Sequence, residues 1–476
     1  MMKGLVWLSR LVIGTLFILS GLIKANDPHG FAYKLEEYFD VFSADLTTKV
    51  SYQLTEEGQA IQDEPCAGKI MEDLKEKVET PIPAEEQGGF TRMLVGMFSF
   101  FADHALSLAI FICVVEILLG AFALFGFALR PVSWLLLGMI VFFTFLTFYS
   151  AYFNKVTDCG CFGDALKLTP WQSFWKDIFL LLFIVPLWWW NRKIKVQPKA
   201  DGAEWALGLA SVAAMAALVL LQFDWWLPFW FLLGLVALRG IIGRIQPKRL
   251  SLAVGLGAVI GSGIFGLYTQ AYEPVRDYRP WRVGNHIPSL RVSKADRVQT
   301  DFLYLRKSDC ELVRKSPDTE GWDWYTLEFE AEHLFWKQDQ VILEKGEEAK
   351  VKDLSLYEPE TEIPFSDSLF TGEGRVFFFV FHQLSKVNLN VLPQVKAIAT
   401  AAQAAGFRVM GGAAATSEEI LAFQAQHQLP FSLYINDEKP LKTILRSNPG
   451  LVELKSGTVV QKWAGRALPT PAELGF

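Results

Sequence analysis

The stretch "GLVWLSRLVIGTLFILSGLI", residues 4–23, decides the class of fold. Its run of about 20 mostly apolar residues is the length that an α-helix needs to cross a hydrocarbon core. Lys3 and Arg10 give it a basic start, as in a signal peptide. Its apolar core is long, however, and "SGLIKANDP" at its end is a poor cleavage site. We therefore expect a retained membrane-spanning helix.

Six further apolar runs of similar length follow within the first 270 residues. They cover residues 105–127, 132–151, 171–190, 203–223, 226–242 and 250–268. Backbone polar groups must be bonded internally in lipid, so helices are the favoured structure for these runs. Tryptophans at their ends, as in residues 188–190 and 225–226, are typical of an aromatic belt at the membrane interface. We predict seven spanning helices and a soluble remainder.

Short loops rich in Lys and Arg orient the bundle, because such loops stay in the cytoplasm. With seven spans, the basic residues beside the first helix, after the second, after the fourth and after the sixth all fall on one side. They are Lys3, Arg10, Arg130, Arg192, Lys193, Lys195, Lys199, Arg239, Arg244, Lys248 and Arg249. We therefore predict a cytoplasmic N-terminus and a C-terminal domain on the outer side.

The charge balance limits the classes of partner. The chain has 45 basic and 51 acidic residues and a net charge of −6, so it has no basic excess and nucleic acid is not expected to bind. Membrane lipid is the expected contact of the spans. The outer segment, residues 24–103, is long and acidic and contains "HGFAYKLEEYFDVF", which we expect as an amphipathic helix on the membrane surface.

The soluble region has strand-like alternation from residue 303 to 356 and then a clearer pattern. "RVFFFVF" (375–381) predicts a buried strand, residues 393–406 a helix, "FRVMGGAA" a strand, and the next helix begins with Ser417 in the capping position. A third strand, "FSLYIND", and a hairpin over residues 448–465 that turns at 455–457 follow. This order is that of a thioredoxin-like fold, which by itself implies no activity.

Thioredoxin chemistry is absent from that domain. A thioredoxin carries Cys-x-x-Cys after its first central strand, whereas "HQLSKVN" (382–388) stands there, and no cysteine follows Cys310. His382 is interpreted as a surface or turn residue because no nucleophile accompanies it. Pro449 stands where the fold keeps a cis proline, although the isomer cannot be read from sequence.

The positions of the cysteines relative to the predicted spans indicate where thiol chemistry is possible. Of the five cysteines, Cys113 lies inside a span, while Cys66, Cys159, Cys161 and Cys310 fall on the outer side. If the host is a two-membrane bacterium, that side is oxidising, which allows two disulfides or one disulfide with free thiols.

Cys159 and Cys161, separated by one glycine in "TDCGCFGDALKLTP", allow several interpretations. A bridge between them closes a small, strained ring, and strained exposed disulfides exchange readily. They can thus form a redox pair, or one can bond Cys66 while the other attacks that bond. The structural alternative is a fixed bridge to Cys66 with a leftover thiol. We expect no metal, since the segment has no His and only Asp158 and Asp164 as oxygen ligands.

Charged residues inside the spans mark a second candidate site, because a carboxylate in lipid usually faces a bundle interior. Glu116 can relay protons or contact a quinone-like head group, or it can simply bond a neighbouring Ser, Thr or Lys176. Lys176 and Asp177 can instead form an interfacial ion pair. Lys24 lies where the first span ends, together with Asp27 and His29, and can snorkel or cap.

Three segments carry a family resemblance: "FILSGLIKANDP" (17–28), "EILLG" (116–120) and "DCGCFGDALKLTPWQSFWKDIFLLL" (158–182). Over about the first 195 residues the chain resembles the DoxX/MauE superfamily of four-helix membrane proteins, with "CGCFGD" the most specific part. The tail, with "YEPVRDYRPWRVGNHIP" (272–288), is further similar to a DoxX-like group from Bacteroidetes. In that group fewer helices precede the tail, so the last three spans resemble an insertion.

The resemblance implies thiol or sulfur redox chemistry at a membrane. MauE-type proteins are associated with maturation of a disulfide-rich periplasmic methylamine dehydrogenase subunit, and DoxX-type proteins with quinone-linked sulfur oxidation. Carried over, Cys159, Cys161 and Glu116 match motif positions. We expect Cys159 and Cys161 to exchange with Cys66 or with the thiols of a partner. A quinone would contact Lys24, Lys176 and Asp177. The tail has no cysteines, so it departs from the pattern of a domain that passes electrons by thiol exchange. It is better suited to docking or substrate binding.

We therefore expect an α-helical membrane bundle followed by a soluble α/β domain, in a bacterial inner membrane with the tail in the periplasm. The expected domains are 1–195 (DoxX/MauE-like, with outer loop 24–103), 196–272 (three further spans), 273–365 (linker and strands) and 366–476 (thioredoxin-like). Two functions stay open. One is a thiol–disulfide oxidoreductase linked to quinone, and the other is a non-enzymatic assembly factor with structural cysteines that binds envelope proteins.

Overall fold

The computed structural model describes residues 2–156, 160, 162–190, 202–352, 354–365, 369–370 and 374–476. The chain forms two compact units, each built from separate stretches of sequence. Unit 1 comprises Met1–Val41, Met97–Ile287 and Asp353–Phe476, and unit 2 comprises Phe42–Gly96 and Pro288–Lys352. The strand-rich region after the last span therefore folds with part of the long segment between the first two spans.

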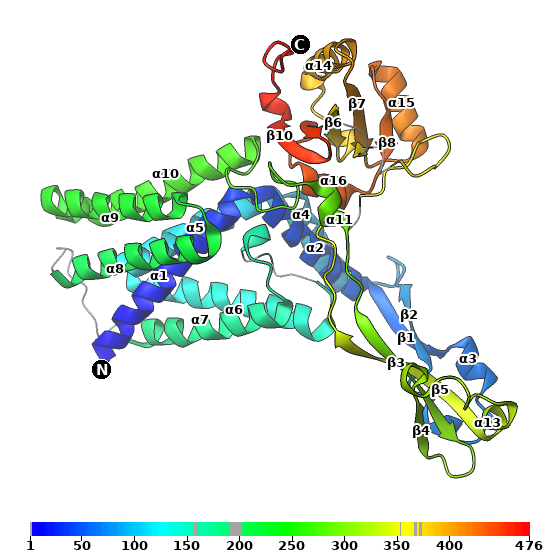
Figure 1. The fold of residues 1–476 in the computed structure, drawn as a ribbon. Helices are drawn as coiled ribbons and strands as arrows, with labels where there is room; N and C mark the ends of the chain where they lie inside the picture. Colours follow the sequence, from blue (N-terminus) through cyan, green and yellow to red (C-terminus); the bar gives the residue numbers. More distant parts are fainter. Residues whose placement is uncertain are drawn as a thin grey trace. The chain divides into compact units, whose positions relative to one another are not determined.

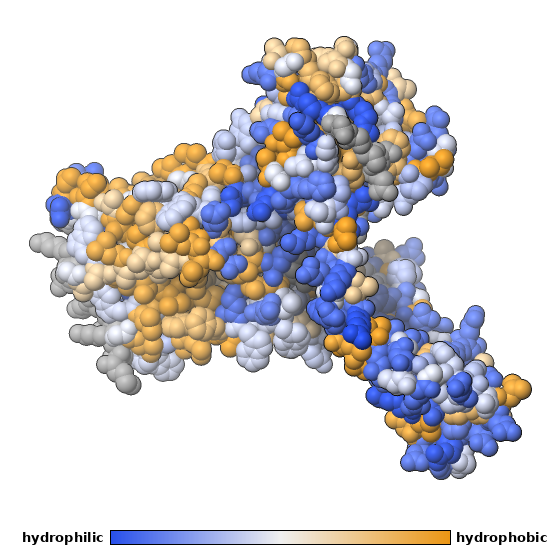
Figure 2. All heavy atoms as spheres, in the orientation of Figure 1, coloured by the Kyte–Doolittle hydropathy of each residue, from blue (hydrophilic) through white to orange (hydrophobic). Residues whose placement is uncertain are grey.

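Unit 1 contains, within the described residues, seven helices long and apolar enough to cross a membrane, which confirms the expected spans. They are α1 (Met2–Asn26), α5 (Ala105–Phe125), α6 (Leu129–Phe153), α7 (Pro170–Trp190), α8 (Gly202–Leu218) with its π-helical extension η3 (Val219–Phe223), α9 (Leu227–Ile245) and α10 (Leu250–Ala271). Hydrophobic side chains cover the visible face of this bundle (Figure 2). Leu182, Trp230 and Ile264 are each at least 63% exposed, as suits contact with lipid.

Helix α1 holds the bundle together by packing against α5, α7, α8 and α10 (Figure 1). Its glycines allow a close approach to α5. A Cβ on Gly14 would lie 2.6 Å from Leu124 Cβ, and one on Gly21 would lie 2.6 Å from Ile117 Cγ1. Small residues at such contacts let helix backbones pack closely in lipid. α1 thus joins the first four spans to the last three.

The amphipathic segment after α1 is helical, as expected, and its apolar face packs against other helices. It forms α2 (Pro28–Thr47), whose Phe31 and Leu35 are buried against Ala109 of α5. Phe39 of α2 also stacks on a ring of α4 (Gly89–Asp103). Packing against protein shields the apolar face from water just as contact with lipid would.

The C-terminal part of unit 1 is an α/β domain. Its elements are β6 (Arg375–Phe381), α14 (Leu392–Ala404), β7 (Arg408–Ala413), α15 (Ser417–His427), β8 (Leu433–Ile435), α16 (Glu438–Ile444), β9 (Gly450–Lys455) and β10 (Thr458–Ala464). The sheet order is β10-β9-β6-β7-β8, with β6, β7 and β8 parallel and β9 and β10 antiparallel (Figure 1). The Phe side chains of β6 form its core with α14.

Two details of this domain refine the sequence predictions. The helix α15 is capped by Thr416 rather than by Ser417, because the Thr416 side chain accepts a hydrogen bond from the backbone N–H of Glu419 and Glu419 bonds back. The predicted hairpin is present, and the Asn448–Pro449 peptide bond before it is cis.

Unit 2 is built from two chain segments that a disulfide joins. Its elements are β1 (Thr48–Leu54), α3 (Glu56–Ala60), β2 (Lys75–Pro81), β3 (Arg297–Arg306), β4 (Leu312–Lys315), α12 (Pro317–Glu320), α13 (Leu327–Glu332) and β5 (His333–Glu344), with α11 (Ile287–Arg291) leading in from α10. β1 and β2 form a two-stranded sheet, and β4-β3-β5 form a three-stranded one. Ile70 and Leu74 pack on Leu305 and Leu334, so the first segment covers one face of the second.

Candidate functional site

The cysteines were the first candidates, and the structure pairs Cys66 with Cys310 inside unit 2. A sulfur forms one disulfide, so neither expected bridge from Cys66 to Cys159 or Cys161 is present. Cys159 and Cys161 themselves lie outside the described residues. Among the described cysteines, only Cys113 is free, and it is buried in α5. The bond at Cys66 therefore leaves the two closely spaced cysteines without Cys66 as a partner.

Described neighbours locate the segment that carries those two cysteines, which we call the cysteine loop (residues 154–169, between α6 and α7). Gly160, between the two cysteines, has φ +66°, and a Cβ there would lie 2.9 Å from Lys34 Cγ of α2. Glycine is therefore required by backbone conformation and by space. Phe162 packs beside Phe223 at the end of η3. Gly160 thus lies against α2, and Phe162 lies at the end of the bundle.

Arg446 connects the cysteine loop to the α/β domain. This arginine lies between α16 and β9, and its guanidinium binds both carboxylate oxygens of Asp27 at 2.6–3.1 Å. Its Nη2 also lies 3.3 Å from Asp164 of the cysteine loop. Burial alone would raise the pKa of Asp27, but the charge and hydrogen bonds of Arg446 outweigh burial and hold that pKa below its usual range. We call Asp27, Asp164 and Arg446 the arginine clamp.

A second ion-pair network fixes the segment that follows α10. Glu273 accepts hydrogen bonds from the backbone N–H groups of Arg446 (2.9 Å) and Ser447 and from Arg279. Arg279 also binds Asp277, which Lys462 of β10 contacts at 2.7 Å. Burial would raise the pKa of Asp277, but Arg279 and Lys462 lower it well below its usual range. The α/β domain is therefore tied to the bundle on two sides within unit 1.

A pocket of about 570 Å³ opens beside the arginine clamp, a size that suits a small molecule or a few side chains. One wall comes from α2, with His29, Tyr33 and Glu36, and the other from the α/β domain, with His382 and Pro449. The sequence interpretation of His382 as a surface or turn residue is confirmed for its place at a bend after β6 and wrong for its exposure, because it is only 7% exposed and contacts the carbonyl of Arg446 through Nε2.

The two histidines make the fold sensitive to acid. Burial lowers the pKa of His382 to about 4, and burial also lowers that of His29. An unfolded histidine has a pKa near 6.5, so the unfolded chain binds more protons between about pH 6.5 and 4.

We therefore expect the free energy of unfolding to fall by on the order of 3 kcal/mol as the pH drops through this window. Thermal unfolding of the detergent-solubilised protein at several pH values measures this. A His382→Gln variant is the control, because it retains only the smaller contribution of His29. An unchanged pH dependence in that variant would contradict the assignment to His382.

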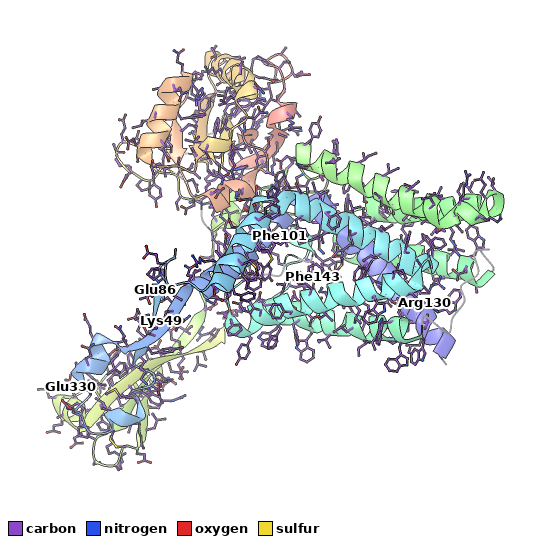
Figure 3. All side chains as sticks on the ribbon, turned by 180° about the vertical axis from the view of Figure 1, so that it is seen from behind. Lys49, Glu86, Phe101, Arg130, Phe143 and Glu330 are labelled. Carbon is purple, nitrogen blue, oxygen red and sulfur yellow. A yellow bond between two sulfur atoms is a disulfide. The ribbon has the colours of Figure 1, made fainter. Side chains whose placement is uncertain are left out.

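Glu116, the carboxylate expected inside the membrane, is buried and pairs with Lys24 rather than Lys176. Lys24 Nζ lies 2.5 Å from Glu116 Oε1, and Ser20 Oγ lies 3.5 Å from Oε2. The same Nζ lies 5.0 Å from the ring centroids of Phe31 and Phe143. Phe143, labelled in Figure 3, lies within the bundle. Two residues flagged separately in the sequence thus form one buried pair flanked by aromatic rings.

Lys176 and Asp177 form the ion pair that the sequence allowed, with Nζ and Oδ1 2.6 Å apart. Asp177 is fully buried and also accepts a hydrogen bond from Thr147 of α6 at 3.2 Å. Lys176 Nζ lies 5.7 Å from the ring of Phe162 in the cysteine loop. Across the described ranges, no group of three or more His, Cys, Asp and Glu side chains could hold a metal ion.

Sequence reasoning missed a buried triad at the other end of α1. Glu204 of α8 binds Arg10 at 2.8 Å and Arg239 of α9 at 3.1 Å, and all three are at least 95% buried. Both arginines are buried inside the helix bundle, so the prediction that they are loop charges orienting the bundle is wrong. Figure 3 shows Arg130, a remaining basic residue at that end, far along the bundle from Phe101 of α4. The sequence signal that could have revealed this triad is Glu204, a carboxylate at the start of the apolar run 203–223.

Comparison with known families agrees with the spans. The family described as "Methylamine utilisation protein MauE" matches residues 86–190, which include α5, α6, the cysteine loop and α7. No curated protein and no solved structure matches the chain. The match covers less than half of the chain, and it supports a membrane protein of the MauE/DoxX-like superfamily.

Proposed function

We propose that this protein is a membrane thiol–disulfide oxidoreductase in which Cys159 and Cys161 exchange electrons with the thiols of a client protein. The observation that carries the proposal is the arginine clamp. Arg446 binds Asp164, three residues from Cys161, and so holds the cysteine loop beside the α/β domain and its pocket. A loop that served only to connect two spans would not need an ion pair to a buried arginine of another domain.

The cysteines divide into two roles in this proposal. Cys66 and Cys310 join the two segments of unit 2, which is the work of a structural disulfide. Cys159 and Cys161 exchange thiols. The Lys and Arg residues of the loops at the N-terminal end support a cytoplasmic N-terminus and a periplasmic C-terminal domain in a bacterial inner membrane. The periplasm is an oxidising compartment in which disulfides form and persist.

The exchange balances as a two-electron reaction. A thiolate of the client attacks the Cys159–Cys161 disulfide and forms a mixed disulfide with one of the two sulfurs. The second client thiolate displaces that sulfur, which closes the client's disulfide and leaves two thiols in the cysteine loop. The client loses two electrons and two protons, and the two cysteines gain them.

The residues of the bundle fit a quinone as the next electron acceptor. A quinone needs hydrogen-bond donors for its carbonyl oxygens and apolar surroundings for its ring. Lys24 offers a donor between Phe31 and Phe143, and Lys176, held by Asp177, offers a second one beside the cysteine loop. When bound, the quinone would supply an acceptor for two electrons and two protons, and Glu116 would hold or release a proton beside Lys24.

The α/β domain fits the docking of the client. Its strand order, with a hairpin on one side of β6 and parallel strands on the other, supports a thioredoxin-like fold. No cysteine follows Cys310 in the sequence, so the domain itself cannot exchange thiols. Its pocket instead faces α2 next to the clamp. That absence of cysteines also favours the alternative of a non-enzymatic assembly factor for an envelope complex.

The experiment measures quinone reduction by the full-length protein in lipid nanodiscs, with a reduced two-cysteine peptide as client and a short-chain benzoquinone as acceptor. We expect the Cys159→Ser, Cys161→Ser double variant to lower the rate by about tenfold or more, because the thiolate is the nucleophile. The matched control is Cys113→Ser, which removes a buried thiol of α5 and should leave the rate unchanged.

Alkylation and mass mapping after mild reduction distinguish the two functions. In an oxidoreductase, Cys159 and Cys161 are labelled before Cys66 and Cys310. If they stay unreactive, or if the double variant keeps the full rate, the redox function is wrong and the assembly factor is favoured.

A further inference from the structure

The β4-β3-β5 sheet of unit 2 has a second face that the proposed redox function does not use. Leu305 and Leu334 point to the face covered by the segment around Cys66. The opposite face carries Tyr304 and Phe335, whose ring centroids are 5.5 Å apart. The stretch from residue 316 to 332 folds over these rings.

That stretch adds an aromatic cluster to the sheet. Trp324 lies 5.9 Å from the ring of Tyr304, and Trp322 lies 5.4 Å from the ring of Phe302. The two indoles stack with centroids 5.8 Å apart and an interplanar angle of 24°, and Tyr325 meets Trp324 edge to face. We call Phe302, Tyr304, Trp322, Trp324, Tyr325, Phe329 and Phe335 the aromatic face.

The outer members of the aromatic face are open to solvent. Trp322 is 57% exposed and Tyr325 is 47% exposed, and the neighbouring Leu327 is 85% exposed. Large contiguous apolar side chains on a water-facing surface usually mark an interaction site.

The stretch of chain at the rim of the aromatic face carries one sign of charge. The stretch from residue 317 to 332 holds six carboxylates and no Lys or Arg, and all six are exposed. They are Asp318, Glu320, Asp323, Glu328, Glu330 and Glu332. Glu320 binds Lys315, and Asp318 accepts the backbone N–H of Thr300. Glu330, labelled in Figure 3, lies on unit 2 and, like Glu328, has no ion pair within the described part of the chain.

Aromatic rings bordered by carboxylates bind cations, because the ring faces and the acids both attract positive charge. One cation–π contact is already present on this surface, because Lys315 Nζ lies 5.8 Å from the ring of Trp324. We propose that the aromatic face, with Trp322, Tyr325, Glu328 and Glu330, docks a Lys- or Arg-rich segment of a partner polypeptide. An anionic lipid surface would be repelled by the same rim.

This proposal does not depend on the redox function, and it is tested on the full-length protein in nanodiscs of zwitterionic lipid. The probe is a fluorescent 12-residue peptide of alternating Arg and Gly, with the Glu–Gly peptide of equal length as its control. We expect binding of the Arg peptide to weaken with salt and to weaken about tenfold in Trp322→Ala, Tyr325→Ala. Charge removal by Glu328→Gln, Glu330→Gln should weaken it by a similar factor.

Matched controls come from the same unit. Tyr52 of β1 is 65% exposed and Glu76 of β2 is exposed, and both lie outside the aromatic face. Tyr52→Ala, Glu76→Gln should bind the Arg peptide as the unmodified protein does, and so should the Cys159→Ser, Cys161→Ser variant. The proposal is overturned if the aromatic variants bind unchanged or if the Glu–Gly peptide binds equally well. Binding of a neutral oligosaccharide in place of the Arg peptide would overturn it in favour of a sugar-binding surface.

Discussion

Replacing Arg446 by alanine is expected to lower the free energy of unfolding of unit 1 by about 3–5 kcal/mol. Asp27 and Arg446 are both largely buried, with side chains 15% and 6% exposed. Removing one member of a buried pair leaves the other charge without compensation, and this is much costlier than losing a surface pair. The same change removes the ion pair between Asp164 and the α/β domain and leaves Asp164 only its pair with Lys167, so we also expect the thiol exchange rate to fall.

Thermal unfolding of the protein in detergent measures the first effect, and quinone reduction measures the second. Arg466→Ala is the matched control, because Arg466 lines the same pocket but is exposed. An Arg446→Lys variant keeps the charge but loses the bidentate contact with Asp27. Its stability should lie between those of Arg446→Ala and Arg466→Ala. Equal stability of Arg446→Ala and Arg466→Ala would show that the arginine clamp contributes little.

The sign of the pH dependence gives an independent check. In the unmodified protein the pKa of Asp27 lies below its unfolded value, so its contribution is present at neutral pH and is lost as the pH falls through that lowered pKa. Without Arg446, burial would favour the protonated acid. The destabilisation caused by Arg446→Ala should therefore shrink as the pH approaches 4, and a penalty that grows in acid would contradict this account.

The spans and the α/β domain were accessible from sequence because local patterns encode them. Apolar runs of about 20 residues predicted all seven spanning helices, and "RVFFFVF" predicted β6, because the length and apolarity of each segment are sufficient signals. The capping residue of α15 was assigned one position too late, since Thr416 and Ser417 are both good caps and only the geometry decides between them.

Contacts between residues far apart in sequence were not accessible in the same way. Cys66 and Cys310 are separated by 244 residues, and their pairing depends on two segments meeting in unit 2. The arginine clamp joins Asp27 to Arg446, which are 419 residues apart in the sequence. No pattern near Arg446 predicts that contact. Glu116 was recognisable because a carboxylate in a span is rare, yet its partner Lys24 had to come from the packing of α1 on α5.

Replacing Glu204 by alanine should destabilise the bundle by a similar amount, about 3–5 kcal/mol. Its carboxylate is shared by Arg10 and Arg239, whose side chains are only 1% and 4% exposed. Both guanidiniums also donate to backbone carbonyls at the end of α5, so they cannot turn to water without losing those bonds. The variant would keep two buried positive charges that no longer share a carboxylate.

The control and the rescue separate charge from volume. Leu209→Ala lies on the same helix α8 at a 59% exposed position and should change thermal unfolding in detergent by less than about 1 kcal/mol. A triple variant, Arg10→Met, Glu204→Leu, Arg239→Met, removes all three charges and fills the space with apolar side chains. It should recover most of the lost stability, since buried ion pairs can often be replaced by well-packed apolar groups without loss. If the triple variant is as unstable as Glu204→Ala, the triad's hydrogen bonds to α5, rather than its charge balance, hold α8 and α9 to the first four spans.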